Sequence, residues 1–338
     1  MPPEAVIMNL MFGKMNYFSL AAIARLGIAD HMSEAPTDVE QIALSSGTQA
    51  PFLYRVLRLL SSAGVFTEGP PRHFALSPAG RLMQSGNPHS MRDMAIMFAD
   101  PWQLQSYARM DDCLRTGKDG VNLAFGKHAF DLFPQIPDQA ANFHRAMTSF
   151  SGVAADAILE VADFSSFHRI VDCGGGHGIL LSRILEKFPR LKGVLFDLPE
   201  VVSGALATGH FSRAEDRVTI ESGSFFERVP GNCDAYIMKH IVHDWDDGSC
   251  RRILSLMREQ LVQTAPDTGR VFLAEMVVPD SPAPAPAKML DIEMLVCTPG
   301  GKERTAAEFA QLLESAGLRL IGIRPLPSPV CLLEAAVC

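Results

Sequence analysis

The chain has 338 residues, of which 47% are hydrophobic and 20% charged, and it carries a formal net charge of -8 at pH 7. Length and composition are typical of a globular protein with room for two domains, and the negative balance argues against general affinity for nucleic acid or an anionic membrane. No apolar run approaches the ~18 residues of a membrane span. The seven scattered cysteines lack a Cys-x-x-Cys motif, so we expect reduced thiols in a cytoplasmic protein.

Residues 1 to about 33 predict a helix, because apolar side chains recur at helical spacing from Val6 to Leu26. The apolar face is longer than one small domain usually needs. It is therefore either an ordinary core helix or a surface that packs in part on a second subunit.

Residues 38–45 and 50–63 predict two short helices, and residues 65–67 and 73–76 predict a hairpin. This order is typical of a winged-helix domain. A DNA-binding face normally concentrates basic residues, whereas this one has only Arg55, Arg58 and Arg72. We prefer a domain for dimer contacts over residues 1–90 and keep a ligand-sensing DNA-binding regulator as an alternative.

Residues 91–150 predict a helical segment rich in methionine and aromatic side chains, including Trp102 and Met147. Such side chains commonly form core, and soft ones also line adaptable pockets for flat aromatic ligands. We expect both roles among different members of the segment.

Residues 151–338 predict a doubly wound α/β domain, because strand and helix patterns alternate. The last strand follows its predecessor too closely for a helical crossover, so it should run antiparallel. Ligands are expected at the carboxyl ends of the parallel strands. The predicted strands lie near residues 168–172, 193–197, 217–221, 234–238, 270–275, 318–323 and 330–337.

A glycine-rich turn joins the first of these strands to a helix over residues 179–188. Its pattern, Asp172-x-Gly174-x-Gly176-x-Gly178, fits the dinucleotide fingerprint poorly, because a bulky residue stands where the last small one belongs. No Walker motif follows. Asp197 ends the next strand, at the offset of an acid that binds ribose hydroxyls. A nucleotide-type cofactor site is favoured over a turn without a ligand.

Gly223, Ser224 and Phe225 follow the third strand at the same edge. A hydroxyl there could bond to an adenine edge, and Phe225 could stack on the ring. A simple capped turn explains the same residues.

The fourth strand is followed by His240, His243 and Asp244, which crowd one strand end. A neutral imidazole can act as a base near pH 7. Two alternatives are a metal site of these three residues, which lacks a known zinc spacing, and a buried structural histidine.

Glu275 ends the next predicted strand, and Glu303 precedes the helix over residues 306–316. A half-buried acid needs a partner. His243 is a plausible one, since acids that orient a histidine fix its tautomer. Alternatively, Glu303 is exposed and pairs with Lys302 or Arg304.

Together these motifs resemble the two-domain S-adenosylmethionine-dependent O-methyltransferases, which include plant caffeate and flavonoid enzymes and bacterial enzymes that tailor antibiotics. The likeness covers nearly the whole chain. It is carried by residues 171–178, 196–199, 223–226, 238–245 and 300–305. The resemblance implies a class I methyltransferase domain, preceded by a winged-helix-like dimerisation domain, that methylates a hydroxyl of a small aromatic acceptor.

The resemblance also implies residue roles. His243 matches the general base, and Glu275 and Glu303 match the carboxylates that hold it. Cofactor contacts are implied for Asp172, Gly174, Gly176, Asp197, Gly223, Ser224, Phe225 and Lys239. Acceptor contacts are implied for Met147 and Asp244. His240 occupies a pocket position that is often aromatic, and Trp102, Met289 and Met294 are further acceptor candidates. The family is typically a homodimer, converts S-adenosylmethionine to S-adenosylhomocysteine, and uses no metal.

One departure is Ser224, where the family usually has Asp; a hydroxyl should bind an adenine amino group less strongly than a carboxylate does. Methylation of nitrogen or carbon is the main rival reaction. A neutral amine needs no base, so the presence of His243 with both glutamates favours oxygen. The intact trio also argues against a non-catalytic subunit.

Overall fold

The computed structural model describes residues 2–205 and 208–338, so Met1 of the predicted N-terminal domain lies outside the described residues. The chain forms two compact units. The first comprises residues 1–104 and 133–150, and the second residues 105–132 and 151–338. The segment predicted over residues 91–150 is thus divided between the units, and the domain boundaries predicted at 90 and 150 stay predictions.

The first unit begins with α1 (Pro3–Arg25), which contacts α3 (Ala50–Ser62) and α5 (Arg92–Met97). The helix is shorter than predicted, because Gly27 adopts a left-handed φ of 63° and the 3-10 helix η1 (Ile28–His31) follows. By length and composition α1 is the one helix in the described residues that could cross a membrane, and 11% of its most apolar window is buried. Its exposed apolar side chains are Val6, Ile7, Met8, Leu10, Met11, Phe12, Met15 and Phe18.

The predicted winged-helix pattern is confirmed. Asp38 caps α2 (Val39–Ser46) by accepting a 3.1 Å hydrogen bond from the Glu40 N–H, and α3 follows. Strands β2 (Phe66–Glu68) and β3 (His73–Leu76) pair antiparallel, and the two-residue β1 (Thr37–Asp38) adds to β3. The core of this unit includes Ile42, Leu57, Phe66 and Phe74.

The helical segment that follows is interrupted, and the loop and short helix predicted near residues 123–133 lie at α8 and α9. Gly117 and Gly126, with φ of 68° and 69°, end two of its helices. The longest, α10, begins in the first unit and ends in the second. The elements are α4 (Pro78–Arg81), α5, α6 (Pro101–Tyr107), α7 (Met110–Thr116), α8 (Gly120–Phe125), α9 (Ala129–Leu132), η2 (Phe133–Gln135) and α10 (Pro137–Val161).

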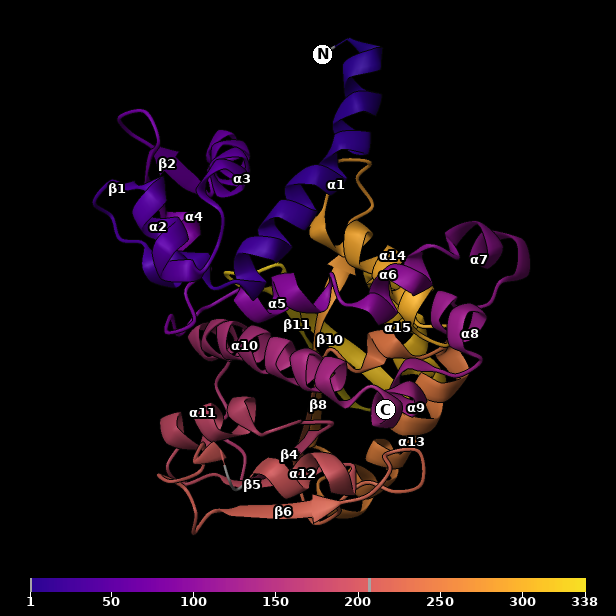
Figure 1. Ribbon diagram of the computed structural model, residues 1–338. Helices are drawn as coiled ribbons and strands as arrows, with labels where there is room; N and C mark the ends of the chain where they lie inside the picture. Colours follow the sequence, from indigo (N-terminus) through magenta and orange to yellow (C-terminus); the bar gives the residue numbers. More distant parts are fainter. Residues whose placement is uncertain (1, 206–207) are drawn as a thin grey trace. The chain divides into compact units, whose positions relative to one another are not determined.

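The second unit contains the predicted doubly wound sheet, in the order β10-β11-β8-β7-β4-β5-β6. Figure 1 labels β10, β11, β8, β4, β5 and β6 of this sheet. As predicted, only the last strand runs antiparallel, between β8 and β10. A short β9 (Arg304–Thr305), which the sequence did not predict, pairs with the end of β8. The strands are β4 (Arg169–Cys173), β5 (Lys192–Asp197), β6 (Val218–Ser222), β7 (Ala235–Lys239), β8 (Arg270–Val278), β10 (Leu318–Pro325) and β11 (Val330–Val337).

Alternate residues along the buried strands enter two separate cores, which is the period-two pattern of a sheet covered on both faces. Ile170 and Leu195 pack in one cluster, whereas Val171 and Val194 pack in the other. Because β4 pairs with both β5 and β7, the strand order reverses at β4, and its carboxyl end is where a ligand crevice forms. The helices of this unit also include α11 (Ile179–Lys187), α12 (Pro199–Ala205), η4 (Val242–Asp244), α13 (Asp247–Thr264), α14 (Pro286–Cys297) and α15 (Ala306–Ser315).

Candidate active site

The glycine loop after β4 leaves its backbone open at one position. Gly174, Gly176 and Gly178 all have left-handed φ angles, of 76°, 59° and 81°. A side chain at Gly178 would place its Cβ 2.3 Å from the Phe211 ring, so only glycine fits there. At Gly176 a Cβ would meet nothing within 4 Å among the described atoms. The loop therefore presents bare main chain at the crevice, which suits a close-fitting ligand.

Asp197 lies beside this loop, as predicted. Its Oδ2 accepts a 2.8 Å hydrogen bond from the Gly176 N–H and its Oδ1 a 2.7 Å bond from the Leu198 N–H. Burial raises the pKa of this carboxyl, although the two N–H donors oppose the shift. Each oxygen can accept a further hydrogen bond, so the carboxylate suits two adjacent ribose hydroxyls.

Ser224 and Phe225 lie in the turn after β6. The Ser224 Oγ accepts a 3.3 Å bond from the Phe226 N–H, which is the local capped turn that the sequence left open as an alternative. The Phe225 ring lies 3.6 Å from the position of a Gly174 Cβ, so it borders the glycine loop. Bare backbone, a ribose-type acid and an aromatic ring thus meet at one strand edge. These residues fit an adenosine-containing cofactor.

Asp172 and Lys239 lie on the neighbouring strands β4 and β7, and each affects the proton affinity of the other. Burial raises the pKa of Asp172 to about 7 although Lys239 opposes the shift, and burial lowers the pKa of Lys239. Among the described residues the Asp172 Oδ2 has no hydrogen-bond partner. A buried acceptor without a donor is costly, so this pair is candidate cofactor machinery rather than core packing.

His243 is held at the end of β7 by the two predicted glutamates. Its Nδ1 lies 2.7 Å from Glu303 Oε1 and 3.9 Å from Glu275 Oε2. Both carboxylate side chains are fully buried. Because a carboxylate can only accept, Nδ1 carries the proton in this bond, and in a neutral ring Nε2 keeps its lone pair.

The carboxylates around His243 control its proton affinity. Burial lowers the pKa of His243, but Glu275, Asp244 and Glu303 outweigh that effect and raise it to about 9. Burial raises the pKa of Glu275 to about 7 and that of Asp244 to about 6, with His243 opposing both shifts. The cluster therefore stabilises a positive charge on this imidazole.

Two sequence expectations about the glutamates need correction. Glu275 lies inside β8 rather than at its end, because β11 pairs with β8 through this residue and onward to Met276. Glu303 is not an exposed partner of Lys302 or Arg304: both cations bind Asp247 instead. The Glu275 Oε1 accepts hydrogen bonds from the N–H groups of residues 241 and 242, at 3.1 and 2.9 Å, which ties the turn before His243 to β8.

Arg304 is a site residue that the sequence did not reveal. Its guanidinium is fully buried and donates to Val242 O and Trp245 O, both at 2.9 Å, on either side of His243. It also donates to Asp247 Oδ1 at 2.8 and 3.0 Å. In the sequence it is one arginine among surface-type residues, and only its position beside Glu303 could have indicated this role.

His240 also joins the cluster. It adopts a left-handed φ of 51°, which is uncommon for a residue other than glycine. Its ring centroid lies 4.9 Å from that of His243, and its Nδ1 lies 3.8 Å from Glu275 Oε2. The metal site that the sequence left open was His240, His243 and Asp244. In the structure Glu275 takes the place of Asp244, because His240, His243 and Glu275 have ligand atoms within 4.8 Å of one another.

The predicted acceptor residues are distributed over both units. Asp244 belongs to the His243 cluster, with its Oδ1 3.5 Å from His243 Nε2. On α14, Met289 is exposed and Met294 is buried. Trp102 and Met147 belong to the first unit, where Trp102 is buried against the Phe133 ring. The roles of all these residues toward an acceptor stay predictions.

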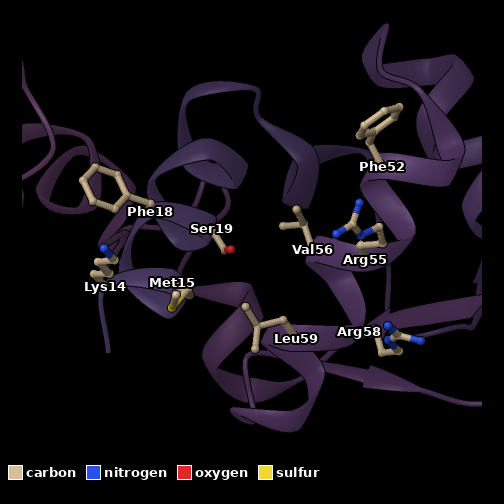
Figure 2. A pocket seen from close by; sticks show the side chains of 9 residues that line it. All are labelled: Lys14, Met15, Phe18, Ser19, Phe52, Arg55, Val56, Arg58 and Leu59. Carbon is tan, nitrogen blue, oxygen red and sulfur yellow. The ribbon is translucent and has the colours of Figure 1, made fainter. Parts of the chain in front are cut away.

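An open pocket of about 650 Å³ lies in the first unit, lined by residues of α1 and α3 (Figure 2). Three cationic side chains and several apolar ones line it. Two of the basic residues noted in the winged helix are engaged within this unit. The guanidinium groups of Arg58 and Arg72 lie over the Tyr54 ring, at 5.3 and 4.8 Å from its centroid. Arg72 also pairs with Glu40. The lining residues are Lys14, Met15, Phe18, Ser19, Phe52, Arg55, Val56, Arg58 and Leu59.

Comparison with known proteins identifies both parts of the chain. Residues 107–319 match the O-methyltransferase domain, and residues 8–86 match the O-methyltransferase dimerisation domain. The phenazine O-methyltransferase PhzM of Lysobacter antibioticus is 35% identical over 334 residues, covering 99% of this chain and 96% of that protein. The 8-amino-8-demethylriboflavin N,N-dimethyltransferase of Streptomyces davaonensis is 34% identical over 310 residues, with coverages of 91% and 88%.

Solved structures of methyltransferases have the same fold as this chain. The structure of CalO1, a methyltransferase in calicheamicin biosynthesis, solved with S-adenosylhomocysteine bound, aligns over the whole of both chains with a TM-score of 0.88 and 29% identity. A glycine loop, a ribose-type acid and a histidine held by two buried carboxylates are thus found on a class I methyltransferase fold. The chain belongs to the O-methyltransferase family and is an S-adenosylmethionine-dependent O-methyltransferase.

Proposed function

We propose that this enzyme methylates a phenolic hydroxyl of a small aromatic secondary metabolite, with His243 as the general base. The observation that carries the proposal is the 2.7 Å bond between His243 Nδ1 and the buried Glu303 carboxylate. This bond leaves Nε2 of the neutral ring as the proton acceptor, and because the carboxylates raise the pKa of His243 to about 9, the neutral form increases as the pH rises toward that value. A phenol, with a pKa near ~10, is mostly protonated at pH 7 and needs such a base.

We assign cofactor binding to the crevice at the end of β4. S-adenosylmethionine, when bound, supplies an electrophilic methyl group on a sulfonium. Asp197 would hold the ribose hydroxyls, Gly174 and Gly176 would follow the methionine part, and Ser224 with Phe225 would lie against adenine. Gly223, Asp172 and Lys239 would complete the residues that contact the cofactor.

His243 would remove the phenol proton as the methyl group is transferred. Glu303 holds the ring in one tautomer, and Glu275 places a second carboxylate 3.9 Å from the same Nδ1. Both stabilise the imidazolium that forms. A positioned base typically contributes ~10²–10⁴-fold to the rate. In this proposal no metal takes part in turnover.

The chemical class of the acceptor is inferred from two relatives and from the candidate acceptor residues. The relative from Lysobacter antibioticus is named for a phenazine, a flat aromatic acceptor. We assign acceptor contacts to His240, Asp244, Met289 and Met294 in the second unit, and to Trp102 and Met147 in the first. N-methylation is the second candidate, because the Streptomyces davaonensis relative is named as an N,N-dimethyltransferase. Matched phenol and aniline acceptors with labelled methyl donor distinguish the two: methylated phenol supports the proposal, and methylation of the aniline alone contradicts it.

We also infer that the enzyme acts as a cytoplasmic homodimer that binds neither membrane nor nucleic acid. The match to a dimerisation domain and the exposed apolar side chains of α1 support a second copy as the partner. The open pocket lined by α1 and α3 adjoins that surface, through Met15 and Phe18. Buried free thiols fit a reducing compartment, and they include Cys113, Cys173, Cys233 and Cys250. The regulator alternative needs free basic residues, and Arg58 and Arg72 are engaged by Tyr54. A mobility-shift assay at physiological salt tests it.

A further inference from the structure

The buried cluster at His243 has the composition of a cation site as well as that of a base. We propose that His240, His243, Glu275 and Glu303 bind a divalent cation of the zinc class, and that the bound cation stops methyl transfer. Binding is argued from the side-chain geometry alone. The inhibitory effect also rests on the proposed role of His243 as the base.

The distances between the side chains are close to those of a metal site. Nδ1 of His240 and Nδ1 of His243 lie 3.8 and 3.9 Å from the same atom, Glu275 Oε2. Glu303 Oε1 lies 2.7 Å from His243 Nδ1, close enough to become a fourth ligand. A tetrahedral zinc ion with bonds of ~2.0–2.1 Å keeps its ligand atoms about 3.3 Å apart. The two separations from Glu275 Oε2 therefore need to shrink by about half an ångström. The ligand atoms of the two histidines lie within 4.8 Å of each other, so the imidazole rings must also move together when the ion binds.

A second observation points to a missing ligand. Glu275 Oε2 and Glu303 Oε2 are both buried and, within the described parts of the chain, neither has a hydrogen-bond partner. The other oxygen of each glutamate is occupied: Glu275 Oε1 by two backbone N–H groups and Glu303 Oε1 by His243. Buried acceptors without donors are rare and costly. A cation between the carboxylates and the imidazoles would satisfy Glu275 Oε2, and it would satisfy Glu303 Oε2 if that carboxylate binds through both oxygens.

Charge balance favours a divalent ion. Two carboxylates and two neutral imidazoles carry a charge of -2, which one divalent cation neutralises, and buried charges are tolerated when they are neutralised in this way. Imidazole ligands suit zinc, cobalt and nickel, whereas magnesium and calcium prefer sites built from oxygen alone. The site should therefore select the first group.

Binding at Nδ1 would switch the tautomer of His243. The new metal–nitrogen bond replaces the Nδ1–H bond, and the proton that the neutral ring retains moves to Nε2. No electron is transferred. Nε2 then carries a hydrogen and has no lone pair to accept the proton of the phenol. A cation bound at Nδ1 of His243 and general-base catalysis by the same residue therefore exclude each other.

The experiment uses the purified full-length enzyme with a phosphine reductant, titrated calorimetrically with zinc chloride alone. Cobalt chloride then tests for the visible absorption of a tetrahedral ion. Methyl transfer is measured against zinc and magnesium. We expect one zinc ion per chain at micromolar affinity, inhibition by zinc that a chelator reverses, and no inhibition by magnesium. Absence of a saturable zinc site would overturn the proposal.

His240→Asn is the informative variant, because it removes the imidazole while asparagine tolerates a left-handed backbone. Loss of this ligand should weaken zinc binding at least about tenfold, because replacing a residue that only hydrogen-bonds to a metal ligand already costs about that much. His168→Asn is the matched control, since His168 is an exposed histidine that also pairs with an acid, Asp234. Equal zinc affinity in His240→Asn and the native enzyme contradicts the site. If His240→Asn does not fold by circular dichroism, Glu275→Gln replaces it in the same titration.

The two proposals fail in different ways. If zinc binds through His240 but turnover continues, the switch is refuted together with His243 as the base. If His243→Ala loses turnover but the native enzyme does not bind zinc, the cation site is refuted and the base stands.

Discussion

Arg304→Lys tests how the active-site segment is held. The native guanidinium donates four hydrogen bonds of 2.8–3.0 Å, to Val242 O, Trp245 O and, twice, to Asp247. A lysine ammonium keeps the charge but cannot reproduce this fork, so it leaves at least one buried carbonyl unpaired. Each such group costs ~1–3 kcal/mol, so we expect the free energy of unfolding to fall by about 2–4 kcal/mol.

The segment between the two carbonyls carries His243, so turnover should suffer as well. We expect kcat to fall about tenfold or more, the equivalent of about 1.4 kcal/mol in the barrier. The affinity for S-adenosylhomocysteine should stay close to native, because Arg304 does not touch the cofactor crevice. Urea unfolding, calorimetry and steady-state kinetics measure the three quantities. Arg324→Lys is the control: Arg324 is partly exposed on β10 and pairs with Glu334. A variant that loses stability but keeps native kcat would refute the positioning role.

Four further predictions concern the cofactor, the metal and the dimer. Asp197→Ala should raise the dissociation constant of S-adenosylhomocysteine, because its hydroxyls lose their acceptor; native affinity would contradict that assignment. Ser224→Asp should lower the dissociation constant of S-adenosylhomocysteine, since a charged acceptor binds the adenine amino group more strongly than a hydroxyl does. Weaker or unchanged binding by calorimetry would count against the assignment of Ser224 to the adenine contact. Chelators should leave native turnover unchanged, whereas loss of activity would show a required metal. Removal of residues 2–12 should reduce the dimer to monomer in light scattering, and a stable dimer would exclude the α1 surface as the contact.

The sequence predicted the sheet well, because its strands are short, buried and flanked by helices. The final antiparallel strand followed from the short connection before it, and the structure pairs residues 330–336 with β8 as expected. The helical region before the sheet was less predictable. A loop was predicted around Gly126, but the break at Gly117 depends on left-handed backbone that a helical apolar pattern does not reveal.

The site was predictable in its parts and not in its contacts. His243 and Glu303 are 60 residues apart in the chain and 2.7 Å apart in space, and only the parallel order of β7, β8 and β9 brings them together. The structure also assigns Lys302 and Arg304 to Asp247, which frees Glu303 for the histidine. No local sequence pattern shows that the Arg304 side chain is buried rather than exposed to solvent, because its burial depends on contacts with residues far away in the chain.

The central claim is that His243 accepts the acceptor's proton. The most direct test is the turnover number of His243→Ala with a phenolic acceptor, measured beside calorimetric binding of S-adenosylhomocysteine. Loss of the base should lower turnover by ~10²–10⁴-fold. Binding of the product should stay at the native level, because His243 contacts the carboxylate cluster rather than the glycine loop. Native turnover in this variant would remove His243 from the mechanism.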